Sequence, residues 1–195
     1  MKLIKTFTVL AAILFFSFNI NAQRIKTVEG DLAEIKNETS ISVEFTYESM
    51  AVGKFDKESE YLEKKKAEYN AKEPGRGDDW EKSWISDRKR EFEPKFIELF
   101  EKNSSMTIKP NSKYTMIFHT TYTEPGYNIY VTRKNAKIDA EVTIFLTADR
   151  SKKIAVISID GAPGRTFSGN DYATGDRISE CYAVSGKKLG KFIKD

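Results

Sequence analysis

Alternating apolar and polar residues predict the strands of a sheet. Residues 40–48, 114–122 and 136–147 show the two-residue period of a strand with one buried face. Residues 154–159 are apolar on both faces, which is typical of a strand with neighbours on both sides. Residues 126–131 favour either an edge strand or a bulged extension. We therefore expect a single layer of about four mostly antiparallel strands.

Residues 75–100 carry the clearest helical pattern and contain both tryptophans. Trp80, Trp84, Arg88 and Phe92 recur every four residues, so they share one face of a helix. Because this face is mostly aromatic, we expect a long helix against which the sheet packs.

Two residues disturb that helix. Pro94 lacks a hydrogen-bond donor and disfavours helical backbone angles at Glu93, so the helix either kinks here or divides in two. Arg88 places a charge among aromatic residues, and a buried charge needs an opposite partner. We expect that partner to be an Asp or Glu of the sheet.

Two further helices are predicted on either side. Residues 56–71 place Tyr61, Lys65 and Tyr69 on one face of a mostly solvated helix. Residues 177–194 form the last helix, with lysines near its C-terminal end. The order β-α-α-β-β-β-α predicts an α+β fold in which the strands pack against helices.

Residues 76–78 spell Arg-Gly-Asp, the cell-adhesion tripeptide. A match of three residues occurs often by chance, and an Asp at this place suits the start of a helix. We therefore expect Asp78 or Asp79 to act as a helix N-cap.

The first 22 residues have the pattern of a secretory signal peptide. Lys2 and Lys5 precede an apolar run over residues 6–18, which is too short to span a bilayer, and Ala22 suits cleavage before Gln23. No cysteine follows the run, so a lipid anchor at that point is excluded. We expect an exported, periplasmic or secreted protein whose residues 23–195 form a single domain without a membrane span.

Charge excludes one class of partner. Without Lys2 and Lys5, 30 of the 32 basic residues remain against 29 acidic ones, a net charge of +1. A dedicated nucleic-acid binder shows a one-signed patch, so nucleic acid is not an expected partner.

Cysteine and histidine are too few for the common catalytic and metal sites. Cys181 is the only cysteine, so no internal disulfide forms, and the thiol is either buried or paired with another chain. His119 is the only histidine, and no Gly-x-Ser-x-Gly motif accompanies it. We expect no metal, no cofactor and no catalytic set.

The glycine-rich residues 160–176 form a loop that can adapt to a ligand. The loop lacks the Gly-Lys-Ser/Thr ending of a phosphate loop and the spacing of a calcium loop. Its candidate ligand contacts are Arg165, Phe167 and Tyr172. Arg88 and Trp84, on the aromatic helix face, complete the candidate ligand-binding residues.

Residues 52–54, 74–78 and 80–96 carry a family resemblance. Their Gly-Arg-Gly-Asp…Trp…Asp-Arg…Pro-Lys-Phe run resembles a family of uncharacterised secreted or periplasmic proteins of Gram-negative bacteria. That resemblance implies no activity, so no functional residue is carried over. The final two strands, glycine-rich loop and helix are similar to envelope lipoprotein domains of the transport-auxiliary kind, but this chain lacks their lipidation cysteine.

The leading hypothesis is a non-enzymatic protein of the cell envelope that binds a small ligand or an envelope protein. One alternative is a hydrolase that uses Asp or Glu together with His119. Another alternative is a subunit of an envelope assembly or transport-auxiliary complex.

Overall fold

The computed structural model describes residues 23–129, 132–164 and 174–195. Its helices are α1 (Glu58–Asn70), α2 (Arg76–Asp87), α3 (Glu93–Ser104) and α4 (Thr174–Lys194), and a π-helical turn (Arg88–Phe92) joins α2 to α3. Its strands are β1 (Arg24–Gly30), β2 (Ser40–Thr46), β3 (Ala51–Val52), β4 (Thr107–Ile108), β5 (Tyr114–Glu124), β6 (Tyr127–Ile129), β7 (Thr132–Lys134), β8 (Ala136–Leu146) and β9 (Asp149–Gly164).

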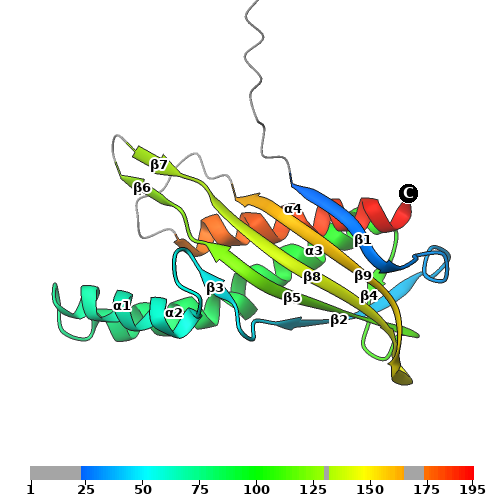
Figure 1. Cartoon of the computed structure of the whole chain (residues 1–195), viewed down its shortest axis with the longest axis horizontal. Coiled ribbons are helices and arrows are strands. Elements are labelled where there is room, and N and C mark those ends of the chain that lie inside the picture. The colour runs from blue at the N-terminus through cyan, green and yellow to red at the C-terminus, as the bar shows by residue number, and fades with distance from the viewer. Residues whose placement is uncertain (1–22, 130–131, 165–173) are drawn as a thin grey trace, which may run out of the picture.

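In this described part of the chain, seven strands form one mixed sheet in the order β1-β9-β8-β5-β2-β4, with β3 also paired to β5 (Figure 1). The pairs β1–β9, β9–β8 and β8–β5 are antiparallel. The pairs β2–β5, β3–β5 and β2–β4 are parallel. The chain leaves β2, passes through the first three helices and returns as β5 beside it, and such a long connection is what a parallel pair requires.

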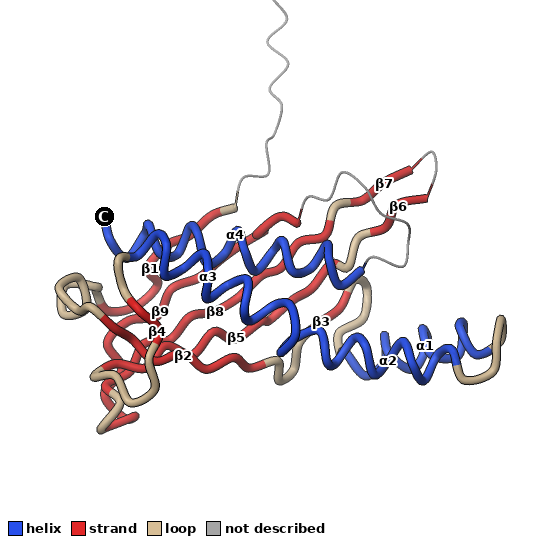
Figure 2. Tube along the Cα trace, turned by 180° about the vertical axis from the view of Figure 1, so that it is seen from behind, coloured by secondary structure: helices blue, strands red, loops and turns tan. Residues whose placement is uncertain are grey.

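Helices α3 and α4 cover one face of this sheet, as Figure 2 shows from behind. Along β8, alternate residues are buried beneath the helices, whereas Lys137 and Glu141 on the opposite face are exposed. Helices α1 and α2 form a hairpin that extends past the end of the sheet (Figure 1). Only half of the predicted aromatic helix therefore packs on the sheet, because α2 packs against α1.

The helices α3 and α4 approach each other closely at glycine. A Cβ atom on Gly186 would lie 2.3 Å from the Phe96 carbonyl oxygen, and one on Gly190 would lie 2.8 Å from that of Phe100. No larger residue fits at these positions without moving the backbone. Phe96 and Phe100 are both fully buried, so this close contact lies over the core.

Tyr182 of α4 ties the helix layer to the sheet. Its hydroxyl lies 2.6 Å from Thr120 Oγ1 of β5, and its ring stacks on Phe92 at a centroid separation of 5.2 Å. Both polar groups are buried and hydrogen-bonded to each other, as buried polar groups require. Burial is also the main cause that raises the pKa of Tyr182.

The α+β class and the packing of strands against helices are confirmed. The prediction of about four mostly antiparallel strands is wrong, as is the simple order β-α-α-β-β-β-α. Strand β1 escaped prediction because it is an edge strand, exposed along most of its length, so it shows no alternation. Strands β3 and β4 have two residues each, which is too short for any period to appear. Residues 127–129 form part of a separate hairpin with β7.

At Pro94 the structure agrees in part with the second alternative, because α2 and α3 are separate α-helices, but a π-helical turn joins them without a break in the helical backbone. The chain remains helical from Arg76 to Ser104, and Glu93 has helical angles of −62° and −45° rather than extended ones. In a regular α-helix the Pro94 ring would collide with the carbonyl group of Arg90. The π-helical turn adds one residue before the proline, with the Glu93 amide bonded to the Arg88 carbonyl oxygen. Pro94 then lies in the first turn of α3, where a missing donor is harmless.

The predicted signal peptide, residues 1–22, lies outside the described residues. None of the helices in the described ranges is both long and apolar enough to cross a membrane. Cys181 is fully buried in the core, as the first of its two interpretations predicted.

Candidate ligand-binding cleft

A chain of aromatic rings runs along the α1–α2 hairpin. Tyr61 of α1 lies 6.0 Å from Phe55, 5.8 Å from Trp80 and 5.1 Å from Trp84, measured between ring centroids. Trp80 also lies 5.6 Å from Tyr69. Residues four or eight positions apart share one face of a helix, so the tryptophans of α2 meet the tyrosines of α1 across the hairpin.

A cleft of about 410 Å³ lies between these rings and the turn that follows β5. This volume falls within the range of small-molecule sites, about 300–1,000 Å³. Phe55, Tyr69 and Trp80 are only half-buried along its wall, whereas Trp84 is buried behind them. The opposite wall is formed by Glu124, Pro125, Gly126 and Tyr127. Three lysines also line the cleft, namely Lys54, Lys65 and Lys134. The cleft thus combines ring faces with basic side chains.

The opposite wall is held by a buried arginine. Arg177 of α4 donates from Nε to the Pro125 carbonyl oxygen at 3.2 Å and from Nη2 to the Gly126 carbonyl oxygen at 3.4 Å. Nη2 also lies 3.1 Å from Thr174 Oγ1. Arg177 is 4% exposed, so its side chain is held rigidly. The wall formed by this turn is therefore fixed to the helix layer.

Glu124 is also buried, but its charge is compensated. It pairs with Lys134 and accepts hydrogen bonds from the Gly126 amide at 3.1 Å and from the Tyr122 hydroxyl at 3.4 Å. The bond to Glu124 is the main cause that raises the pKa of Lys134.

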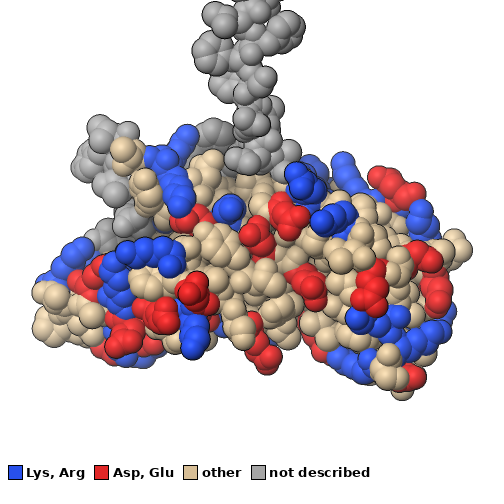
Figure 3. Space-filling view, viewed as in Figure 1, with Lys and Arg blue, Asp and Glu red and all other residues tan. Residues whose placement is uncertain are grey.

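Basic side chains surround the rings at the cleft. The ammonium groups of Lys54 and Lys64 lie 5.6 and 5.8 Å from the Phe55 centroid. Lys65 lies 5.8 Å from the Tyr69 centroid. Figure 3 shows Lys and Arg side chains gathered along the edge of the α1–α2 hairpin that faces β6 and β7.

Two of the predicted ligand-binding residues, Trp84 and Arg88, hold the base of the hairpin. Both donate hydrogen bonds to the same oxygen, Glu58 Oε1, and Arg88 also forms an ion pair with Glu58. The guanidinium group of Arg88 lies 4.2 Å from the ring centroid of Tyr47. The expected charged partner of Arg88 thus exists, but the prediction that it comes from the sheet is wrong, because Glu58 belongs to α1.

These two residues have little room for a ligand between them. They line a void of about 10 Å³ together with Tyr47, Phe92 and Tyr182, and such a void holds one water molecule at most. Arg88 also borders a shallow, open depression beside Tyr47. The other predicted ligand residues, Arg165, Phe167 and Tyr172, lie outside the described residues.

A second cleft, of about 590 Å³, shares Glu124 and Lys134 with the first. Its lining is polar and carries both signs of charge, including Arg24, Asp139 and Asp160. The Asp139 carboxylate accepts a hydrogen bond from the Gly161 amide at 2.6 Å. Among the residues that the structure describes, none of those lining this cleft is aromatic, unlike in the first cleft.

His119 lies on the open face of the sheet, away from the aromatic cleft. Its Nδ1 atom lies 2.9 Å from Thr46 Oγ1, and Glu141 is its register partner on β8. Ser158 follows Glu141 in the same row on β9. Among the described residues no hydrogen bond joins His119 to Glu141 or Ser158, and no cluster of three metal-ligating side chains occurs.

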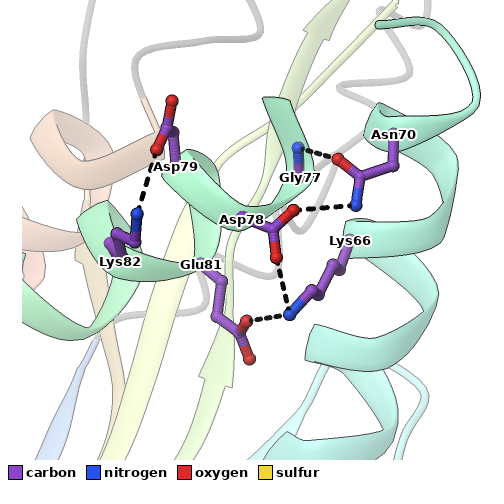
Figure 4. A network of polar contacts seen from close by, with 7 residues as sticks. All are labelled: Lys66, Asn70, Gly77, Asp78, Asp79, Glu81 and Lys82. Atoms are coloured by element: carbon purple, nitrogen blue, oxygen red, sulfur yellow. Dashed lines mark hydrogen bonds and ion pairs between the residues drawn. The ribbon is translucent and has the colours of Figure 1, made fainter. Parts of the chain in front are cut away.

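The Arg-Gly-Asp segment closes the hairpin. Asp78 and Glu81 each lie 2.9 Å from Lys66 Nζ, and Asn70 of α1 binds both the Gly77 amide, at 2.6 Å, and Asp78 (Figure 4). The prediction of Asp78 or Asp79 as N-cap is wrong, because the N-cap is Gly75, at φ 86°. Asp78 instead joins α2 to α1, and the bond to Lys66 is the main cause that lowers its pKa.

Solved structures resemble the chain only distantly. The PelC dodecamer from Paraburkholderia phytofirmans gives a TM-score of 0.37 at 10% identity, over 84% of this chain and 96% of that one. A variant of the same PelC gives 0.36 at 11%. A Xanthomonas campestris protein of the family DUF330 gives 0.35 at 12%, over 51% of this chain and 57% of that one. No family model and no curated protein matches the chain. Function must therefore be argued from the geometry.

Proposed function

We propose that the protein is an exported, non-enzymatic binding protein of the cell envelope, and that the aromatic cleft is its binding site. The observation that carries this proposal is the row of half-buried rings, Phe55, Tyr69 and Trp80, along a cleft of about 410 Å³. Export is supported by the pattern of residues 1–22.

The rings favour a ligand with a flat, apolar face. When a flat ring or the C–H face of a sugar covers half-buried aromatic side chains, apolar surface is removed from water and the complex is stabilised. The opposite wall is fixed by Arg177, so little order has to be imposed on that wall when the ligand enters.

The fluorescence of the two tryptophans can report ligand binding in this cleft. The two tryptophans of the chain are Trp80 in the cleft and Trp84 directly behind it, at a centroid separation of 5.6 Å. We expect at least one ring-bearing probe among cellotetraose, tetragalacturonate and adenosine monophosphate to change their fluorescence in a saturable manner. If none does so at millimolar concentration, the proposal is wrong.

A matched pair of variants locates the site. Trp80→Ala removes one ring face, and we expect it to weaken the binding of the active probe about tenfold or more in calorimetry. Ile85→Ala is the control, since Ile85 lies on the same helix, is 43% exposed and does not line the cleft. Circular dichroism must show that both variants are folded.

A hydrolase is the second candidate, and the row Thr46–His119–Glu141 on the open sheet face is the observation that favours it. In this arrangement His119 would act as a base and Glu141 would stabilise its charged form. Turnover of ester, phosphate or glycoside substrates that disappears in His119→Ala, but not in Trp80→Ala, would favour this function over the first.

A further inference from the structure

The charges at the aromatic cleft do not cancel. Three lysines line it, Lys54, Lys65 and Lys134, whereas Glu124 is the only acidic residue in its lining among the described residues. Glu124 is 10% exposed in its side chain and already binds Lys134, the Gly126 amide and Tyr122. It therefore neutralises Lys134, and the charge that faces a ligand comes from the other two lysines.

Lys54 and Lys65 can contact a ligand without losing a strong interaction within the protein. Among the residues described, no ion pair joins Lys54 to an acidic side chain, and its ammonium group lies over the Phe55 ring. Lys65 pairs with Glu68 at 3.3 Å, but the two side chains are 31% and 43% exposed. Ion pairs at such exposed positions stabilise a protein only weakly, so an anionic ligand can replace Glu68 as the partner of Lys65.

Aromatic rings grouped around a cleft also suit a cation such as a quaternary ammonium group. In this cleft, cationic side chains of the protein itself already lie close to the rings. Lys54 and Lys64 lie within 6 Å of the Phe55 centroid, and Lys65, Lys72 and Arg76 lie equally close to Tyr69. A cationic ligand would meet these charges, whereas an anionic one would be attracted by them.

We infer that the ligand of the aromatic cleft is a flat ring that carries an anionic group, with Lys54 and Lys65 as its charge contacts. This inference rests on the proposed function, because it names the class of ligand for the same site. A uronic-acid saccharide and a nucleoside phosphate share this chemistry, and the experiment distinguishes them.

The test compares three probes by tryptophan fluorescence: tetragalacturonate, cellotetraose as the neutral saccharide, and adenosine monophosphate. We expect tetragalacturonate to bind at least about tenfold more tightly than cellotetraose. Its affinity should fall as the salt concentration rises from 0.01 to 0.5 M, because salt screens exposed charges, whereas any cellotetraose binding should not change. Tight binding of adenosine monophosphate without binding of tetragalacturonate would support the same chemistry and identify a nucleoside phosphate as the class of ligand.

Two lysine variants test the contacts. Lys54→Gln and Lys65→Gln each remove one charge, and we expect each to weaken the binding of the anionic probe by about tenfold and to reduce its salt dependence. Lys95→Gln is the control, because Lys95 is exposed on α3 and does not line the cleft, and the loss of net charge is the same.

The outcomes separate the two proposals. Equal binding of cellotetraose and tetragalacturonate, or anion binding that Lys54→Gln and Lys65→Gln leave unchanged, overturns this inference and leaves the proposed function standing. Failure of all three probes overturns both.

Discussion

A single carboxylate, Glu58, satisfies two donors at the base of the hairpin. Trp84 Nε1 and the Arg88 guanidinium both bind its Oε1 atom, and the side chains of Glu58 and Arg88 are each 16% exposed. The sequence marks Arg88 as a charge that needs a partner. It does not mark Glu58, because a glutamate in the first turn of a helix is explained equally well by the helix dipole.

Glu58→Gln should lower the free energy of unfolding by about 1–3 kcal/mol. The amide oxygen can still accept both hydrogen bonds, but the charge of Arg88 loses its compensation in a mostly buried site. Glu60→Gln is the control, since Glu60 is exposed in the same helical turn. Urea denaturation measures both variants, and equal midpoints would contradict the role assigned to Glu58.

Cys181 should behave as an inert thiol. Its side chain is fully buried, and this burial raises the pKa of the thiol because the thiolate is poorly solvated there. We expect no reaction with a thiol reagent at pH 8 in the native protein and complete reaction in denaturant. Rapid labelling of the native protein, or a disulfide-linked dimer without reducing agent, would show that the thiol is accessible.

The pair Glu44–Arg150 links β2 to the start of β9 and gives an expected pH dependence. The hydrogen bonds from Arg150, one of them 2.9 Å long, hold the pKa of Glu44 below its usual value of 4.5. A lowered carboxyl pKa contributes stability that is complete above pH 4.5 and is lost as the pH falls through the folded-state pKa. In Arg150→Gln, we expect the pKa of Glu44 to rise toward 4.5 in an NMR titration. Lys95→Gln should leave it unchanged.

Among the helices and strands, the regular ones were predictable and the short or exposed ones were not. The bounds of β2, β5 and β8 lie within about two residues of the predicted ranges, because apolar and polar residues alternate along each of them. The bounds of α1 are equally close to the prediction, although Tyr61 is its only buried residue. The edge strand β1 has no buried face to create a period. Pro94 is the only sign of the π-helical turn in the sequence. The extra residue of this turn becomes evident only in the structure, where α2 packs on α1 and α3 packs on the sheet.

The contact between α3 and α4 gives an expected result for Gly186→Ala. Alanine favours a helix over glycine by about 1 kcal/mol, so helix propensity alone predicts stabilisation. Here the new Cβ atom would lie 2.3 Å from the backbone oxygen of Phe96, which has no rotamer to change. We therefore expect net destabilisation of about 1–3 kcal/mol, measured by thermal unfolding. Lys187→Ala, an exposed neighbour, should change the midpoint little.

At the scale of the whole molecule, the sequence predicts an α+β fold but not its site. The cleft is assembled from segments far apart in the chain: the turn after β3, the α1–α2 hairpin, the turn after β5 and the start of α4. Tyr61, Lys65 and Tyr69 were visible as one face of a mostly solvated helix, but the pattern assigned no function to that face. Its role depends on β3 and β5 running side by side in parallel, and local periodicity does not specify such long-range pairings.

The projection of the α1–α2 hairpin past the sheet has a kinetic consequence. The hairpin carries one wall of the cleft, whereas Arg177 fixes the other wall to the helix layer. Segments with few contacts to the main core open at a lower free energy than the whole protein, so the backbone amides of α1 and α2 should exchange with deuterium faster than those of β8. A ligand that binds only the closed hairpin lowers the population of the open form by a factor of 1 + [L]/Kd, and hydrogen exchange through that form slows accordingly. At a probe concentration of about 100 Kd, we expect roughly hundredfold slower exchange in α1 and α2.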